Sequence, residues 1–248
     1  MTNNRRRTFI SYGGFLLLVQ LAAACGPAES GKEEAPQARP EANATPGASV
    51  EPGGKAAADA DLVVAFGDSL FAGYQLGQDQ GFAPALEREL AKLGQPAHVF
   101  NAGVSGDTSA EGLQRLAYVL DGLPKKPDLV IVGLGGNDML RGVSPEVTRK
   151  NLTAIMEELD RRNIDVVLAG MRAAPNMGRD YAQAFDPIYP DLAERYDVPL
   201  YPFILDGVIG DKKLLLPDGV HPNPQGVGKI VSGIGGTIAK ALDLIGRQ

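Results

Sequence analysis

The part of the sequence best suited to carry chemistry is VVAFGDSLFAGY, Val63 to Tyr74, in which an apolar run leads into Gly-Asp-Ser-Leu. Ser69 therefore stands where a buried strand gives way to a tight turn. A serine hydroxyl is a weak nucleophile near neutral pH and needs a base within hydrogen-bond reach. Asp218 and His221 stand three residues apart near the other end of the chain. An imidazole that is oriented by a carboxylate can activate a hydroxyl. This combination of serine, histidine and aspartate therefore predicts nucleophilic acyl transfer.

The chain has only two histidines, and their surroundings differ. His221 lies in LPDGVHPNPQG, where proline stiffens the backbone and helps to aim the side chain. The alternative is a surface histidine in a turn. His98 lies in the apolar run Ala97–Phe100, where we expect a partly buried strand residue. Gly-x-Ser-x-Gly is absent around Ser69, so the nucleophile turn of ordinary α/β-hydrolases is not expected.

Three further acidic residues stand beside these motifs: Asp68, Asp107 and Asp138. Their positions next to turns could indicate catalysis. Acidic side chains also cap helices and brace turns, and we interpret all three in this way.

The elements that must position these residues follow from hydrophobic periodicity. Strand-like runs occur at Leu62–Phe66, Ala97–Phe100, Leu129–Val132, Val166–Ala169 and Val198–Tyr201. Helical spacing occurs over Phe82–Leu90, Thr108–Leu120, Pro145–Arg161, Tyr181–Tyr196 and Gln225–Leu244. Apolar strands that alternate with helices predict a parallel sheet covered on both faces. The predicted class is α/β, a flavodoxin-like three-layer α/β/α sandwich with about five parallel strands.

In such open sheets, function gathers beyond the carboxyl ends of the strands. Polar or glycine positions that follow the predicted strands are Ser69, Asn101, Gly106, Asn137, Asp138, Asp218 and His221. Four loops are therefore expected to converge on one rim of the sheet.

Four motifs, in order along the chain, resemble the motif blocks of the GDSL, or SGNH, hydrolases. They are Gly67-Asp68-Ser69-Leu70, Asn101–Thr108, Gly135-Gly136-Asn137-Asp138 and Asp218–Asn223. The resemblance covers nearly all of residues 61–245 and is closest to the bacterial periplasmic thioesterase, lysophospholipase and arylesterase branch. It implies the SGNH hydrolase fold for this chain.

The resemblance also implies a role for each matching residue. Ser69 would be the nucleophile, His221 the general base and Asp218 the carboxylate that orients His221. The oxyanion hole would consist of the backbone N–H groups of Ser69 and Gly106 and the side-chain amide of Asn137. Glycine lets the backbone approach a substrate closely, and an amide keeps its proton at any working pH.

The implied activity is cleavage of carboxylic esters or thioesters through an acyl-serine intermediate, of arylesterase, lysophospholipase or acyl-CoA thioesterase type. Its substrate would be a small acyl ester, a thioester or a lysophospholipid. One alternative is a carbohydrate O-acetylesterase of the cell envelope, and another is a non-catalytic module that binds a ligand at the same rim. No cofactor is expected, because the sequence has no Cys or His cluster with metal-binding spacing.

Residues 1–25 have the order of an export signal. Basic Arg5-Arg6-Arg7 precede the apolar Phe15–Val19, and small residues lead to Cys25, the only cysteine. This apolar run is short for a transmembrane helix. The segment resembles a lipoprotein-type signal peptide that ends at a lipobox, with Cys25 as the lipidated residue. Cleavage near Ala24 by ordinary signal peptidase is the alternative.

Residues 26–60 are rich in Ala, Pro, Glu and Gly and predict a disordered tether before a hydrolase domain at 61–248. We therefore expect an exported protein of the bacterial cell envelope, anchored to the membrane and facing the periplasm. A soluble periplasmic or secreted form is the alternative. The net charge of −6, without a basic block, argues against nucleic acid as a partner.

Overall fold

Apolar side chains of the central strands point alternately to the two faces of a sheet in the computed structural model, which describes residues 60–246. The strands are β1 (Asp61–Gly67), β2 (Ala97–Gly103), β3 (Leu129–Gly133), β4 (Asp165–Ala169) and β5 (Leu200–Tyr201). They lie in the order β2-β1-β3-β4-β5, and all neighbours are parallel. In β1, Val63 and Ala65 enter one core cluster, and Val64 and Phe66 enter the other. This confirms the predicted parallel α/β sheet.

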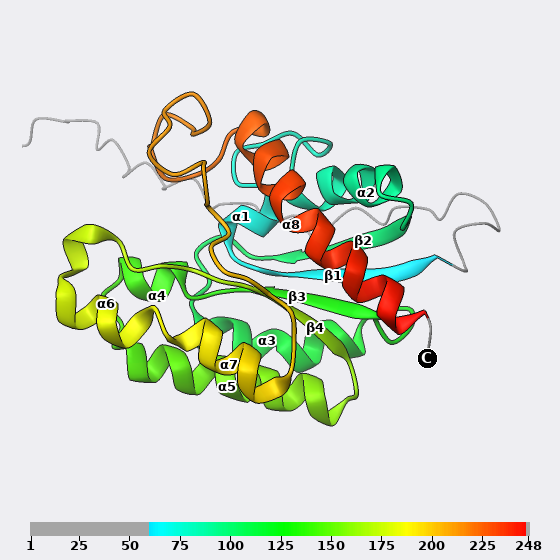
Figure 1. Cartoon of the computed structure of the whole chain (residues 1–248), viewed down its shortest axis with the longest axis horizontal. Helices are drawn as coiled ribbons and strands as arrows, with labels where there is room; N and C mark the ends of the chain where they lie inside the picture. The colour runs from blue at the N-terminus through cyan, green and yellow to red at the C-terminus, as the bar shows by residue number, and fades with distance from the viewer. Residues whose placement is uncertain (1–59, 247–248) are drawn as a thin grey trace, which may run out of the picture. The chain divides into compact units, whose positions relative to one another are not determined.

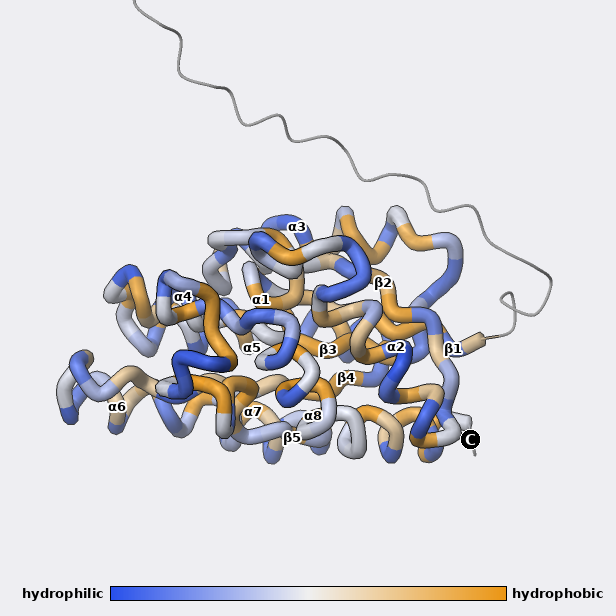
Figure 2. The backbone as a smooth tube through the Cα atoms, turned by 90° about the horizontal axis from the view of Figure 1, so that it is seen from above, coloured by the Kyte–Doolittle hydropathy of each residue, from blue (hydrophilic) through white to orange (hydrophobic). Residues whose placement is uncertain are grey.

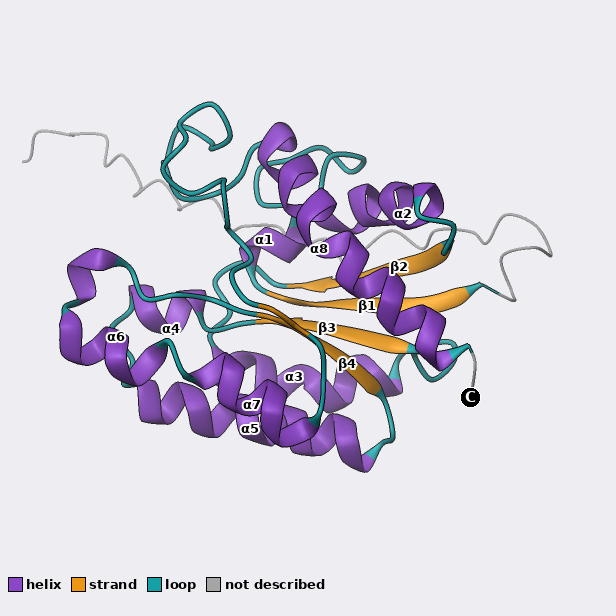
Figure 3. Cartoon of the chain, in the orientation of Figure 1, coloured by secondary structure: helices purple, strands orange, loops and turns teal. Residues whose placement is uncertain are grey.

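Helices cover both faces of the sheet (Figures 1 and 3). One layer holds α1 (Ser69–Ala72), α2 (Phe82–Lys92) and α8 (Pro224–Ile245). The other holds α3 (Ser109–Asp121), α4 (Gly136–Leu140), α5 (Pro145–Arg161), α6 (Arg179–Phe185) and α7 (Ile188–Tyr196), with a short 3-10 turn, η1 (Pro175–Met177), before α6. Figure 2 shows the hydrophobic residues running through the middle of the domain, along β3 and β4.

One predicted helix is wrong in its extent. Tyr181–Tyr196 forms two helices, α6 and α7, that are separated at Asp186 and Pro187. Proline has no N–H to donate to the preceding turn, so a helix cannot continue through it without losing a hydrogen bond. The periodicity continues across the break because both helices pack into the same core cluster.

Two expectations about β2 are also corrected. Asn101 was expected after the strand, but pairing with β1 continues as far as Gly103, so Asn101 lies inside β2. His98 was expected to be partly buried, but its side chain is 61% exposed and its Nδ1 lies 2.9 Å from Glu87 Oε1. The reason is that β2 is an edge strand, which leaves part of its surface open to solvent.

Several expectations fall outside the described residues. They are the signal peptide at 1–25, lipidation at Cys25, and the tether at 26–60 apart from its last residue. Across residues 60–246, no helix has both the length and the apolar character that a membrane span requires.

Candidate active site

Ser69 begins α1, a helix of a single turn that lies on the carboxyl ends of the central strands. Parallel register places Gly67 beside both Gly103 and Gly133. A Cβ atom at Gly103 would lie 2.2 Å from the backbone nitrogen of Ala72, and a Cβ at Gly133 would lie 2.2 Å from the Phe71 ring. The absence of side chains at these strand ends therefore lets α1 rest directly on the sheet, with Ser69 at the rim.

Asp68 caps this short helix. Its Oδ1 accepts a hydrogen bond from the N–H of Leu70 at 3.1 Å, and its side chain is buried, with the residue 8% exposed. Burial raises the pKa of the Asp68 carboxyl to about 6, although the Leu70 N–H and the charge of His221 act in the opposite direction. The helix cap agrees with the structural interpretation of Asp68.

Ser69, His221 and Asp218 lie in one hydrogen-bonded line. His221 Nε2 is 2.9 Å from Ser69 Oγ, and His221 Nδ1 is 2.7 Å from Asp218 Oδ2. In the tautomer that this arrangement favours, Nδ1–H donates to the carboxylate and Nε2 accepts from the serine hydroxyl. Residues 152 positions apart in the chain are thus brought into direct contact.

The loop before α8 holds His221 in place through its own backbone. Leu215 and Pro222 form an isolated antiparallel bridge, and the N–H of Leu216 donates to the carbonyl of His221 at 2.7 Å. Asn223 anchors the end of this loop that leads into α8. Its amide nitrogen donates to the carbonyl of Lys213 at 2.8 Å, while its Oδ1 caps the start of α8.

Asp218 is fixed by backbone donors as well as by the imidazole. Its Oδ1 accepts from the N–H groups of His221 and Val220, both at 2.9 Å. These backbone hydrogen bonds, and then the hydrogen bond from the His221 ring, lower the pKa of Asp218 to about 2. The side chain is therefore an anion at neutral pH and can orient the imidazole.

The three expected oxyanion donors follow three neighbouring strands: Ser69 begins α1, Gly106 lies in the loop after β2, and Asn137 lies in α4. Asn137 Nδ2 donates to the carbonyl of Asp107 at 3.0 Å and lies 3.4 Å from Asp68 Oδ2. Gly106 has a φ of 90°, in the region that favours glycine, and its carbonyl accepts from Arg141 Nη2 at 2.6 Å. Within residues 60–246, the N–H groups of Ser69 and Gly106 form none of the backbone–backbone hydrogen bonds of the turns and loops. Both groups can therefore donate to a bound oxygen.

The other two acidic residues brace these loops. Asp107 accepts from Arg115 Nε, and Arg115 Nη2 donates to the carbonyl of Gly67 at 2.9 Å. Asp138 is fully buried and accepts from both the backbone N–H and the hydroxyl of Ser109. These contacts tie the loops after β1, β2 and β3 together, as expected for structural carboxylates.

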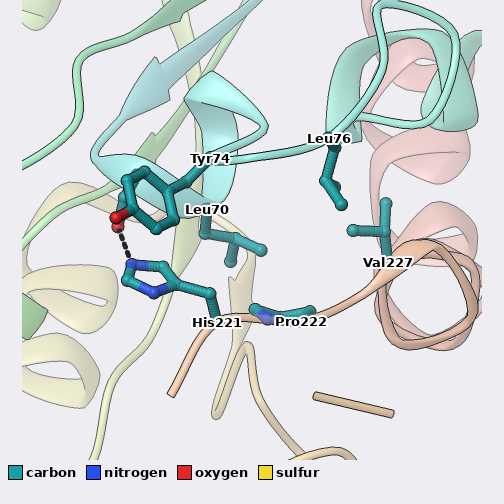
Figure 4. Close-up of a pocket in the computed structure, with 7 residues that line it drawn as sticks. Leu70, Tyr74, Leu76, His221, Pro222 and Val227 are labelled. Atoms are coloured by element: carbon teal, nitrogen blue, oxygen red, sulfur yellow. Dashed lines mark hydrogen bonds between the residues drawn. The ribbon is translucent and has the colours of Figure 1, made fainter. Parts of the chain in front are cut away.

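One neighbour of the site was missed by the sequence analysis. The ring of Tyr74 lies against the imidazole of His221, with centroids 4.4 Å apart and planes 36° apart (Figure 4). The hollow beside them is lined by Ser69, Leu70, Tyr74, Leu76, His221, Pro222 and Val227. Tyr74 belongs to the stretch that carries Ser69. Its residue type and its spacing from Ser69 do not reveal that its ring contacts the imidazole of His221, which is distant in the sequence.

The arrangement can pass a proton from a hydroxyl to an imidazole while amide donors receive a negative oxygen, which is the requirement of acyl transfer. In the part of the chain that the structure describes, no group of three or more His, Cys, Asp or Glu side chains could hold a metal ion.

Comparisons with known proteins point to the same chemistry. The model of the GDSL-like lipase/acylhydrolase family matches residues 65–228. An arylesterase of Vibrio mimicus is 39% identical over 165 residues, 66% of this chain and 82% of the relative. Thioesterase 1/protease 1/lysophospholipase L1 of Escherichia coli K12 is 41% identical over 167 residues, 67% of this chain and 78% of the relative. The crystal structure of AlinE4, an SGNH-hydrolase family esterase, is 51% identical with a TM-score of 0.64, and the match covers 74% of this chain and 97% of AlinE4.

Proposed function

Because the chain belongs to the GDSL-like lipase/acylhydrolase family, we propose that Ser69, His221 and Asp218 form the catalytic machinery of this ester and thioester hydrolase. The observation that supports the assignment most directly is the unbroken line from Ser69 Oγ through the imidazole to Asp218, with separations of 2.9 and 2.7 Å. If Ser69 only shaped a turn, its hydroxyl would not require a hydrogen bond to an imidazole that is itself bonded to a carboxylate.

In the first half of the reaction, Ser69 Oγ attacks the acyl carbon and its proton passes to His221 Nε2. The carbonyl oxygen becomes negative and is held by the N–H groups of Ser69 and Gly106 and the amide of Asn137. The bond to the leaving oxygen or sulfur then breaks, and His221 returns the proton to that atom. The products are the free alcohol or thiol and an acyl ester on Ser69.

In the second half, water takes the place of the leaving group. His221 removes a proton from the water as it attacks the acyl carbon, and the same donors hold the oxygen. The bond to Ser69 Oγ breaks, Oγ recovers the proton from His221, and the carboxylic acid departs. Asp218 keeps its charge throughout and faces the positive imidazolium in both halves.

Ser69→Ala tests the nucleophile. The variant should lose turnover of p-nitrophenyl esters by a factor on the order of 10³ or more, because the covalent route is closed. Its urea unfolding midpoint should stay near that of the wild type, since the change removes only one half-buried hydroxyl and its hydrogen bond to His221. Wild-type turnover in this variant would contradict the assignment.

A covalent label separates the base from the nucleophile. A fluorophosphonate should add one group to the wild-type protein, as read by intact mass, and none to Ser69→Ala. His221→Ala should be labelled far more slowly, because the hydroxyl then lacks its base. Equal labelling rates in His221→Ala and wild type would remove His221 from the mechanism.

For the substrate, we propose an acyl ester, a thioester or a lysophospholipid, in line with the arylesterase and thioesterase 1/lysophospholipase L1 names of the relatives. A series of p-nitrophenyl esters from acetate to decanoate, together with an acyl-CoA and a lysophospholipid, measures the preference. Activity that extends to the longer chains supports this substrate class. A sharp maximum at acetate would favour an O-acetylesterase instead.

For the location, we propose that the protein is exported to the cell envelope and anchored there by lipidation of Cys25. The basic start, the short apolar run and the lone cysteine after small residues support this proposal. The active site would then work at the membrane surface from the end of the segment 26–60, within reach of lipid-derived esters.

A further inference from the structure

Tyr74 contacts both residues that are proposed to perform the chemistry. Its backbone N–H donates to the carbonyl of Ser69 at 3.0 Å. Its ring lies against the imidazole of His221 at a centroid separation of 4.4 Å (Figure 4). The side chain therefore stands where the nucleophile helix meets the base.

The backbone of the turn around Tyr74 is strained. Gly73 and Gln75 both have left-handed conformations, with φ of 75° and 57°, and the N–H of Leu76 donates to the carbonyl of Gly73 at 3.0 Å. Gln75 is not a glycine, so this conformation is unfavourable for it. Its side chain also donates to the Tyr74 hydroxyl at 3.1 Å. Both parts of Gln75 thus hold the aromatic ring in place.

Core packing does not account for this ring. Tyr74 is 37% exposed, whereas the aromatic residues that fill the core, such as Phe71 and Phe82, are at most 1% exposed. The ring lies against the imidazole, which gains a positive charge each time it takes a proton from Ser69 or from water. An aromatic face attracts a cation, and it offers no hydrogen-bond acceptor that would draw Nε2 away from Ser69.

We propose that Tyr74 is a positioning residue: its ring holds the imidazole of His221 in line with Ser69 and stabilises the protonated imidazole during acyl transfer. The proposal rests on the proposed roles of Ser69 and His221. The charged groups around the imidazole are Asp218 on its own loop and Asp68 at the start of α1, and both remain in every Tyr74 variant.

The first test compares Tyr74→Leu with Tyr74→Phe. Leucine removes the aromatic face, so kcat/KM should fall about two- to ten-fold and the acid limb of its pH profile should move about 0.3–0.7 pH unit lower. Phenylalanine keeps the face and should stay within about two-fold of wild type. Tyr118→Leu, on α3 at a residue that is 83% exposed, is the matched control and should leave both readouts unchanged.

The second test observes the imidazole directly. The chain has two histidines, so the ring proton signals of His221 can be assigned in NMR spectra with His98→Gln as the reference. The titration midpoint of His221 should fall in Tyr74→Leu and stay near wild type in Tyr74→Phe. If Tyr74→Leu does not fold, Tyr74→Met provides a second aliphatic variant.

Three results would overturn the proposal: wild-type kinetics in Tyr74→Leu, equal losses in the Leu and Phe variants, or a loss of kcat/KM with an unmoved titration midpoint. Failure of the proposed function is a separate outcome, because it would appear as turnover in Ser69→Ala whatever the Tyr74 variants do.

Discussion

Asp68 and Asp218 are two carboxylates beside the same Ser69–His221 pair, and their surroundings drive their pKa values in opposite directions. Asp68 is buried, and desolvation raises its pKa to about 6. Asp218 accepts backbone hydrogen bonds from His221 and Val220, which lower its pKa to about 2. One acid is therefore partly protonated near pH 6, while the other keeps the charge that an orienting carboxylate needs.

The raised pKa of Asp68 predicts a specific dependence of stability on pH. The folded state binds the Asp68 proton more tightly than the unfolded state, whose pKa is near 3.8. The contribution of Asp68 to the free energy of unfolding is therefore highest below pH 3.8 and declines until about pH 6. Asp218 acts in the opposite sense. Its contribution to the free energy of unfolding is present above pH 3.8 and is lost as the pH falls toward 2.

Asp68→Asn isolates the first effect, because asparagine keeps an oxygen for the Leu70 N–H but cannot ionise. Between about pH 4 and pH 7, the unfolding free energy of the variant should rise relative to wild type by about 2–3 kcal/mol. Urea unfolding at the two pH values measures this difference, in which titrating groups that do not interact with Asp68 cancel. A difference that does not change with pH would contradict the burial of an ionisable Asp68.

At the scale of single residues, the sequence could predict which types stand at the rim but not every contact between them. Ser69, Asp218 and His221 were predicted from their types, loops and family resemblance. The ring contact between Tyr74 and His221 depends on a left-handed turn at Gln75, a residue that does not favour this conformation. Sequence patterns indicate the backbone conformation that each residue type prefers, so they do not predict a strained conformation such as that of Gln75.

At the scale of elements, the packing of α1 against the strand ends decides where Ser69 lies. The space beside Gly103 is occupied by the backbone of Ala72, which cannot give way as a flexible side chain can. In contrast, a Cβ atom at Gly236 on α8 would meet nothing within 4 Å. The two glycines therefore offer a matched pair of substitutions.

Gly103→Ala should push α1 away from the sheet, lower the unfolding free energy by about 1–3 kcal/mol and reduce esterase turnover. Gly236→Ala should raise the unfolding free energy by about 0.5–1 kcal/mol, because alanine favours a helix and meets no neighbour. Urea unfolding and p-nitrophenyl ester hydrolysis measure both variants. If Gly103→Ala is as stable and as active as wild type, α1 does not rest on β2 as described.

Elements were predictable where periodicity alone determines them. The four longer strands and the helices over 82–92, 109–121, 145–161 and 224–245 lie close to their predicted positions. The loop between β5 and α8 was not predictable in detail, since its shape depends on Asn223 bonding to Lys213 and on the bridge from Leu215 to Pro222. Such contacts between neighbouring loop residues carry no periodic signal.

At the scale of the whole molecule, the described domain contains both core clusters and every proposed catalytic residue. We expect the preceding segment to determine location and not to take part in the chemistry. Cys25→Ser should move the protein from the detergent phase to the aqueous phase in a Triton X-114 partition of cell extracts and leave kcat/KM unchanged. Ser69→Ala, with Cys25 intact, is the control and should stay in the detergent phase. Equal partition of Cys25→Ser and wild type would contradict lipidation.

The separation of Ser69 and His221 by 152 positions has a consequence for the order of biosynthesis. Ser69, the proposed nucleophile, begins the first helix, whereas the imidazole depends on Asn223 and the start of α8, the last helix. A chain that is still attached to the ribosome therefore carries its serine for most of translation without a base. If Ser69 and His221 have the proposed roles, the nascent protein should stay inert toward esters until its final helix has emerged and docked.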